Sequence, residues 1–297
     1  MEGAAEALLP AGAGEGAVRS EVEGRRRLQS LEALGEAVSA MKSLSAHHFR
    51  EARRAVEPAR AYQRGVERLL RGAGAPSTGG TGGAGLLVIG AELGLCGSYN
   101  AQVAAEATAR RAVLGRGPTF CVGHRAVSLL HRRGVEVERA YTAPTRVAGI
   151  TGLLLSLAED VLGRYAADRL ASFDIVSSRF EGVGLVRPAS TRLLPSAGSA
   201  AEATYGVRYV SQDAFVFAAT REFLYITLHD LLLDALASEH GARLFATQSA
   251  EKWLDEQATR LRRRLAATRR EASTQEVMEI AAGARARAAE APRLDLA

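Results

Sequence analysis

The chain has 297 residues, enough for one large domain or two modest ones, each with a sizeable core. Hydrophobic residues make up 47% and charged residues 24%, a balance that predicts a soluble globular protein. No run of 18 apolar residues occurs, which argues against a membrane-spanning helix, and the acidic start does not resemble a signal peptide. The net charge of +5 permits an acidic partner, a nucleic acid or an anionic membrane face without choosing among them.

The N-terminal part of the chain predicts a disordered extension over residues 1–20 and one long helix over residues 21–71. Within the helical segment, Pro58 is expected to kink the helix or to end its regular part. Apolar and small residues recur there at spacings of three and four, which indicates the seam of a left-handed coiled coil. The seam positions are Leu31, Leu34, Val38, Met41, Ser45, His48, Ala52, Ala55, Ala59, Tyr62, Val66 and Leu69.

The middle of the chain predicts a flexible linker over residues 72–85, which are mainly Gly, Ala, Ser and Thr, and then an α/β domain over residues 86–205. The domain is indicated by short apolar runs that alternate with helical stretches. The expected strands are Leu86–Ile89, Thr119–Val122, Val135–Val137 and Phe173–Ser177, and the expected helices are Ala101–Val113, Ala126–Arg132 and Arg146–Ala167.

The helical pattern resumes over residues 206–285 and is followed by a tail, residues 286–297. Two helices of roughly 50 and 70 residues would be about 75 and 105 Å long, far more than the ~30 Å diameter of a compact domain. We therefore expect the two helices to pair as an antiparallel coiled coil and to project. The second seam consists of Leu224, Leu228, Leu231, Ala235, Ser238, Ala242, Phe245, Leu254, Ala258, Leu261 and Leu265.

A heptad seam by itself is typical of adaptors, tethers and scaffolds, and short motifs narrow the choice. Arg27-Leu-Gln-Ser-Leu31, Ala40-Met-Lys-Ser-Leu-Ser-Ala46 and Gly94-Leu-Cys-Gly97 are three of them. Leu236-Ala-Ser-Glu-His240 and Thr274-Gln-Glu276 follow in the last helix. In order and spacing these motifs resemble the gamma subunit of F-type ATP synthases, and the resemblance covers about residues 22 to 285.

The resemblance implies a central rotor shaft that has no catalytic activity and is present in one copy per complex. Its terminal helices would pair, with a Rossmann-like α/β domain beside the base. The implied partners are the alpha and beta subunits, the epsilon subunit and the membrane-embedded ring of c subunits. The implied location is the cytoplasmic face of a bacterial inner membrane, where the subunit would be peripheral and would couple ion flow to conformational change.

The same resemblance assigns the residues that would transmit torque. It places Met41 and Lys42 opposite the beta subunits. An arginine-rich face suits acidic loops of a partner, although a solvated basic face has the same composition; this face comprises Arg260, Arg262, Arg263, Arg264, Arg269 and Arg270. The complete set of expected subunit contacts is Met41, Lys42, Arg243, Arg269, Arg270, Thr274, Gln275 and Glu276.

The glycine-rich loop after the first strand contains Gly94, Leu95, Cys96 and Gly97. A phosphate-binding loop of the ATPase type would end in Gly-Lys-Ser/Thr, and neither this ending nor the three-glycine dinucleotide fingerprint is present. A structural turn that packs the strand against a helix is the favoured interpretation.

No catalytic set, metal site or cofactor is expected. His47 and His48 are adjacent, so they are expected to point to different faces of the helix. Glu239-His240 also lacks a partner in sequence, and the cysteines, Cys96 and Cys121, have neither metal-ligand nor redox spacing.

Two other classes of protein remain as alternatives: a coiled-coil scaffold with an α/β domain, and an arginine-rich nucleic-acid binder. The latter should interleave aromatic residues with its basic surface, and aromatic residues are only 5% of the chain. Several positions depart from the family pattern, among them His48, Ala266 and Arg270. They leave open whether the complex is a housekeeping or a second, alternative ATP synthase.

Overall fold

The computed structural model describes residues 12–72, 82–167, 170–194 and 210–290. The chain divides into two compact units, which we describe separately. The terminal unit comprises residues 1–39 and 249–297, and the central unit comprises residues 40–248. Two long helices contribute to both units: α1, Gly12–Gly72, and α5, Gln212–Glu290.

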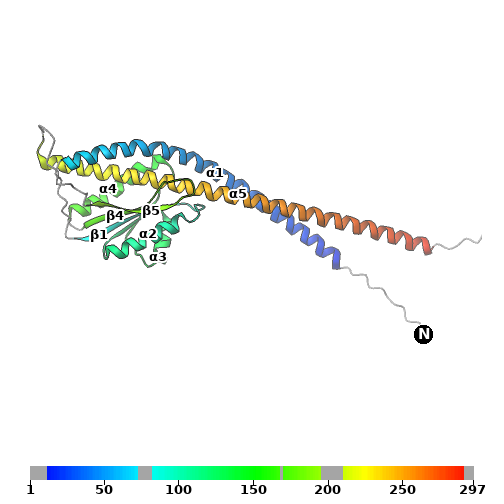
Figure 1. Ribbon diagram of the computed structural model, residues 1–297. Helices are drawn as coiled ribbons and strands as arrows, with labels where there is room; N and C mark the ends of the chain where they lie inside the picture. Colours follow the sequence, from blue (N-terminus) through cyan, green and yellow to red (C-terminus); the bar gives the residue numbers. More distant parts are fainter. Residues whose placement is uncertain (1–11, 73–81, 168–169, 195–209, 291–297) are drawn as a thin grey trace, which may run out of the picture. The chain divides into compact units, whose positions relative to one another are not determined.

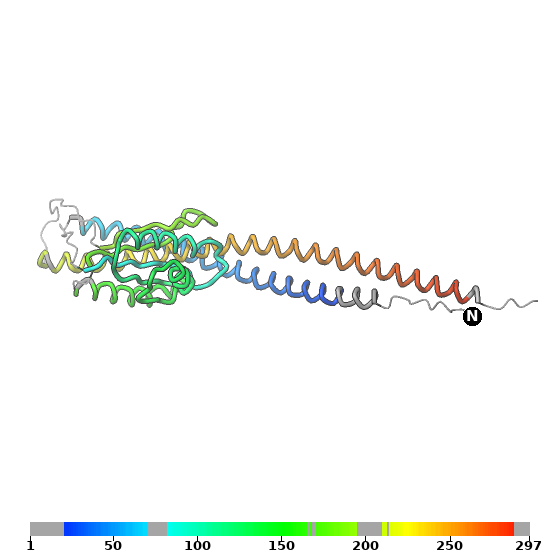
Figure 2. Tube along the Cα trace, turned by 90° about the horizontal axis from the view of Figure 1, so that it is seen from below, coloured from blue at the N-terminus to red at the C-terminus, as the bar shows by residue number. Residues whose placement is uncertain are grey.

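The helices α1 and α5 are antiparallel in both units. In the central unit, the Gln63 side-chain amide donates to the Thr227 hydroxyl over 3.1 Å, and Arg60 donates to Asp234 over 2.6 Å. Figure 1 shows the two helices side by side there. In the terminal unit, Arg262 donates to Glu32 over 2.6 Å. Figure 2 shows the blue part of α1 alongside the orange part of α5 in this unit. The predicted helix pairing is therefore confirmed.

The seam on α1 is partly shifted from its predicted register. Ala52 and Ala59 are buried as expected, but Val56 is buried between them, and Tyr62 is 54% exposed. The reason is that α1 shares one core with the sheet and with the helix α4, Ile150–Ala166, as well as with α5, so its buried face turns toward the sheet. A seam calculated for a two-helix coil alone misses this third layer.

The ends of the predicted segments differ from the structure in two places. Helix α1 already includes residues 12–20, so the predicted disordered extension is wrong there, and residues 1–11 lie outside the described part. The helix also continues through Pro58 instead of ending at it. Most of the predicted linker, residues 73–81, and most of the predicted tail, residues 291–297, lie outside the described part as well. Residues 83–85 of that linker belong to the first strand, and residues 286–290 of that tail belong to α5.

The sheet of the central unit has five strands in the order β3-β2-β1-β4-β5. Strands β1 to β4 pair in parallel, and β5 is antiparallel to β4. The strands are β1, Gly83–Ile89; β2, Thr119–Val122; β3, Arg139–Tyr141; β4, Leu170–Arg179; and β5, Arg187–Leu194. The other helices are α2, Tyr99–Leu114; α3, His124–Arg132; and α4, Ile150–Ala166, which follows a 3₁₀ turn, Val147–Gly149.

Two strands differ from the sequence prediction. The third strand is Arg139–Tyr141, so the predicted strand Val135–Val137 is wrong by several residues. Strand β5 was not predicted, because Pro188 and the polar residues around it weaken the apolar signal. Both strands lie at the edges of the sheet, where proline is tolerated and burial is incomplete. The domain is consequently a mixed sheet with a parallel core.

Alternate residues of the buried strands enter two different cores. Leu87 and Ile175 belong to a core that also contains residues of α1, α4 and α5. Leu86 and Val176 belong to the other core, with residues of α2 and α3. Successive side chains of a strand point to opposite faces of the sheet, and here both faces are covered by helices. None of the described helices has a stretch that is both long and apolar enough to cross a bilayer.

Candidate subunit-contact surface

The last turns of α5 form the most exposed part of the described chain. From Arg269 to Arg287 every residue except two is exposed, and those two are half-buried. Exposed apolar side chains occur among the polar ones: Val277, Met278 and Ile280, with Met278 67% exposed. Nothing in the described residues covers them. Grouped apolar side chains on a surface are typical of contact sites for a partner.

Five predicted contact residues lie on this exposed part of α5. They are Arg269, Arg270, Thr274, Gln275 and Glu276. Three of the five line a shallow pocket together with apolar and acidic side chains; the complete lining is Arg270, Glu271, Thr274, Gln275, Met278, Glu279 and Ala282. The structure therefore brings three of the predicted polar contacts onto one surface with Met278, which sequence reasoning missed.

Ion pairs hold the two helices of the terminal unit together close to this surface. The Arg269 Nε donates to the Glu21 carboxylate over 2.6 Å, and Arg25 donates to the same carboxylate oxygen. The hydrogen bond from Arg269 is the main cause that lowers the pKa of Glu21. Arg269 is therefore partly committed to α1, whereas Thr274 donates its hydroxyl only to the Arg270 carbonyl of its own helix.

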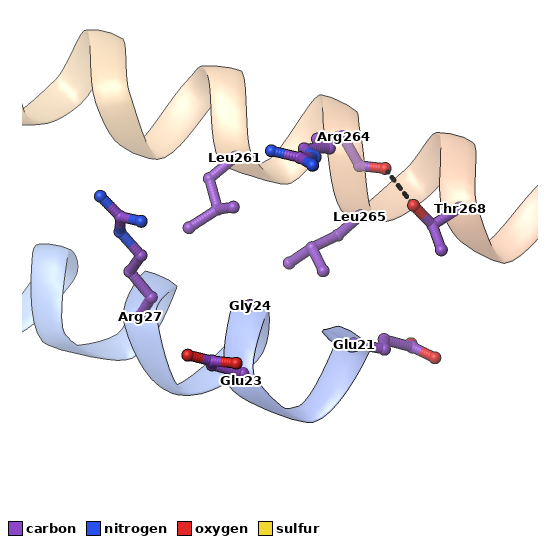
Figure 3. A pocket seen from close by; sticks show the side chains of 8 residues that line it. All are labelled: Glu21, Glu23, Gly24, Arg27, Leu261, Arg264, Leu265 and Thr268. Carbon is purple, nitrogen blue, oxygen red and sulfur yellow. Dashed lines mark hydrogen bonds between the residues drawn. The ribbon is translucent and has the colours of Figure 1, made fainter. Parts of the chain in front are cut away.

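A glycine on α1 lets the two helices of the terminal unit approach closely. A Cβ at Gly24 would lie 2.7 Å from Cδ2 of Leu265, so any larger residue at this position would force the Leu265 side chain to move. Figure 3 shows Leu261 and Leu265 pointing from α5 toward α1 at this place. The shallow pocket around them is lined by Glu21, Glu23, Gly24, Arg27, Leu261, Arg264, Leu265 and Thr268.

The remaining predicted contacts lie in the central unit. Met41 and Lys42 are half-buried on α1, so each retains an accessible side. Arg243 differs from its prediction as a subunit contact, because its side chain is only 2% exposed and turns inward. Its guanidinium donates to the Glu239 carboxylate over 2.5 Å and to the carbonyls of Leu93 and Gly94 over 3.3 and 3.1 Å. In this structure Arg243 therefore acts inside the chain.

The partner of Glu239 and His240 is this same arginine. The Arg243 Nη1 lies 3.3 Å from His240 Nδ1, and the His240 Nε2 lies 3.0 Å from the Thr145 carbonyl. Burial, and then the charge of Arg243, lower the pKa of His240 to about 4. The spacing of four residues between Glu239 and Arg243 was the sequence signal that could have revealed the pair.

The Gly94–Gly97 loop joins β1 to α2 and is fixed on α5 by Arg243. Leu95 and Gly97 both have left-handed backbone, with φ of 58° and 56°. The Cys96 thiol is buried, which raises its pKa, and the Cys96 carbonyl accepts from the Tyr99 amide over 3.1 Å. Tyr99 in turn donates its hydroxyl to the Ala235 carbonyl of α5 over 3.2 Å. These contacts support the structural role predicted for the loop.

The Glu92 carboxylate connects the loop after β1 to the start of α3 and to the segment after β3. Glu92 accepts from the backbone amide of Ala143 over 3.0 Å, from the His124 amide at the start of α3, and from His124 Nδ1 over 2.6 Å. Burial opposes ionisation of Glu92, but these hydrogen bonds prevail and its pKa is lowered. The His124 amide at the start of α3 is thus bound within the chain and is not free for an anion from solvent.

The two adjacent histidines of α1 differ from their prediction. His47, His48 and Glu51 place one possible ligand atom each within 4.8 Å of one another, so the histidines do not diverge. The His48 ring also packs against the His240 ring, with 5.2 Å between centroids. Sequence reasoning considered the pair of histidines but missed Glu51, which lies three and four residues further along the helix.

Comparison with known proteins gives one consistent result. A family model described as ATP synthase matches residues 21–286. The ATP synthase gamma chain of Methylobacterium sp. strain 4-46 is 30% identical over 289 residues, which cover 88% of this chain and 97% of that protein. The gamma chain of Desulforamulus reducens is 28% identical over 276 residues, with the same coverage of both chains.

Solved structures share the fold at lower sequence identity. A chain of the Euglena gracilis mitochondrial ATP synthase matches with a TM-score of 0.66 and 16% identity, covering 94% of this chain and 98% of that one. A chain in the central stalk and c-ring structure of the Tetrahymena thermophila enzyme matches with a TM-score of 0.57 and 18% identity, covering 72% and 99%.

Proposed function

The chain belongs to the gamma-chain family of ATP synthases, and from this premise we propose that it is the rotating central-stalk subunit of an F-type ATP synthase. The observation that carries the proposal is the match over residues 21–286, which includes both long helices and the sheet between them. A match confined to the helices would fit any coiled-coil scaffold, whereas this one includes the α/β domain.

The helix pair has the physical properties that a torque shaft needs. Antiparallel helices that share a buried seam resist separation, and cross-helix hydrogen bonds such as Arg60 to Asp234 and Gln63 to Thr227 fix their register. Two paired helices also lack three-fold symmetry. In a three-fold arrangement of catalytic sites, such a shaft presents a different side to each site and biases each toward a different conformation.

The proposed partners follow from the exposed surfaces. The end of α5 with Arg270, Thr274 and Gln275, together with Met41 and Lys42 on α1, would contact the alpha and beta subunits. The epsilon subunit and the c ring would bind the base of the stalk, in line with the central stalk and c-ring complex that holds the similar Tetrahymena chain. One copy would serve each complex, peripheral at the cytoplasmic face of a bacterial inner membrane.

Catalysis would reside in the partners, and this chain would take no cofactor. The support is the sequence, which contains no catalytic set of residues and neither a phosphate-loop ending nor a dinucleotide fingerprint. Of the two other classes, the scaffold and the nucleic-acid binder, neither gains support from the fold matches or the relatives.

Co-expression with the alpha and beta subunits of the same genome tests the proposal. We expect a complex containing one copy of this chain, with much higher ATPase activity than the alpha–beta hexamer alone. Size-exclusion chromatography and an ATPase assay measure both properties. A chain that remains free in the presence of assembled hexamer would contradict the proposal. Genes for the alpha, beta and epsilon subunits should also lie next to the gene for this chain.

A further inference from the structure

Three potential metal ligands lie together on α1 in the central unit: His47, His48 and Glu51. His48 Nδ1 is 3.4 Å from a Glu51 carboxylate oxygen, and the His47 and His48 rings have centroids 5.3 Å apart. His47 is exposed, and the other two are half-buried. The mechanism proposed above uses none of the three, and among the described residues the His47 ring has no hydrogen-bonding partner.

This donor set matches a known class of ion. Two imidazoles and one carboxylate are ligands for zinc and related divalent transition metals, which commonly keep a water as fourth ligand. Tetrahedral ligands at about 2.1 Å from zinc are about 3.4 Å from one another. The His48–Glu51 pair already has this separation, and the exposed His47 can close the remaining distance by side-chain rotation. We propose that His47, His48 and Glu51 bind one divalent transition-metal ion of the zinc class.

The surroundings hold His48 in place without competing for the metal. His240 packs against the His48 ring, but both His240 nitrogens are engaged, one with the Thr145 carbonyl and one with Arg243. The Arg243 charge is itself neutralised by Glu239. A group that packs against a ligand ring limits its rotation and so lowers the cost of ordering it on binding.

Nearby charge sets a limit on the affinity. Arg50 and Arg54 are exposed on the same helix, next to the carboxylate ligand. Glu51 supplies the only negative charge in the donor set, so a monovalent cation would gain little binding energy there. A divalent ion that forms directional bonds to imidazole gains most, which is the reason for assigning the zinc class.

Cobalt binding to the full chain, prepared without an affinity tag, tests the site. We expect one Co²⁺ per chain, visible d–d absorption bands typical of a low coordination number, and displacement by one equivalent of Zn²⁺. Removal of a group that only orients a ligand costs roughly 10–100-fold in metal affinity, so loss of a direct ligand should cost at least about tenfold. We expect that loss in His47→Ala and in Glu51→Gln, measured by calorimetric titration with Zn²⁺.

Matched variants distinguish this site from general surface binding. His131→Ala removes another exposed histidine, on α3, and Glu57→Gln removes another exposed carboxylate of α1; both should bind Zn²⁺ as the unchanged chain does. Unaltered binding in His47→Ala and Glu51→Gln would overturn the proposal, as would the absence of d–d bands. A near-ultraviolet thiolate-to-cobalt band would place the ion at a cysteine and would overturn it too. Because the isolated chain is measured, the result does not depend on assembly with other subunits.

Discussion

Helix α5 buries nearly every residue between Leu224 and Arg243, whereas it buries none between Arg270 and Arg287. The buried part nevertheless includes Asp234, Glu239 and Arg243, and the exposed part includes Met278. Polarity therefore does not follow burial along this helix. The buried charges have partners within the chain, and the exposed apolar side chains have none among the described residues, as is typical of a surface that contacts another molecule.

Breaking the buried ion pair between Arg243 and Glu239 should reduce the unfolding free energy more than any other change proposed here. Arg243→Met leaves the Glu239 carboxylate buried without its cation, and removing one partner of a buried pair costs about 3–5 kcal/mol of unfolding free energy. The double variant Arg243→Met/Glu239→Leu should recover part of the loss, since no charge then remains unpaired. Chemical denaturation measures both variants.

The matched control is an exposed pair of the terminal unit. Arg262→Met breaks the pair with Glu32, in which both side chains are about half exposed, and should cost no more than about 1 kcal/mol. Equal losses in Arg243→Met and Arg262→Met would show that burial does not separate the two parts of the helix.

A proline in the buried part should come next in effect. Ala242→Pro removes a backbone hydrogen bond in a buried helical turn and should cost about 3 kcal/mol or more, and it should abolish coupling in the assembled enzyme. Ala286→Pro, in the exposed last turns, should only fray the helix end and leave the melting temperature almost unchanged. Circular dichroism and ATP-driven pumping measure the two outcomes. Intact pumping in Ala242→Pro would contradict the helix pairing as the route of torque.

The buried histidine should make the central unit sensitive to acid. Folding lowers the pKa of His240 from 6.5 to about 4, so between these values the unfolded chain binds more protons than the folded one. Neutral His240 makes its full contribution to the unfolding free energy above pH 6.5, and this contribution is lost as the pH falls toward 4. Between pH 7 and pH 5 the unfolding free energy should fall by about 2 kcal/mol. Denaturation at several pH values measures it. The variant His240→Gln should lose that part of the slope, and an unchanged slope would exclude His240 as its source.

The exposed end should show the smallest effect on stability. Arg270→Ala and Gln275→Ala should each change the unfolding free energy of the free chain by less than about 0.5 kcal/mol, because neither side chain is buried. The same variants should lower the ATPase activity of the assembled complex, which an activity assay at fixed subunit ratio measures. A large loss of stability in the free chain would mean that this surface packs within the chain.

Much of the fold was predictable because its signals are local. The three- and four-residue spacing of α1 and α5 predicted two long helices, and the buried runs such as Leu86–Ile89 predicted the parallel strands. The edge strand β5 was not predictable from the same signal, since its half-buried residues and Pro188 do not form an apolar run. The shift of the buried face from Ala55 to Val56 depended on the sheet, which is distant in sequence.

The predicted contact residues also differ in how well the sequence alone described them. Thr274 and Gln275 were identified from a short motif and are exposed, as a contact residue must be. Arg243 was identified from the same family resemblance, yet its guanidinium is buried against the loop that carries Gly94. A motif identifies a family position, but it does not say whether the position faces inward or outward.

The sequence by itself determined the family, the two long helices and the parallel strands, because residue spacing and collinear motifs are properties of the chain in one dimension. Only the tertiary structure decided which of the predicted contact residues are exposed and which are buried within the chain. Arg243 is internal because Glu239 and the carbonyls of Leu93 and Gly94 surround it, and the last two of these come from a strand-to-helix connection nearly 150 residues away. Contacts over such separations arise from packing, and no local pattern contains them.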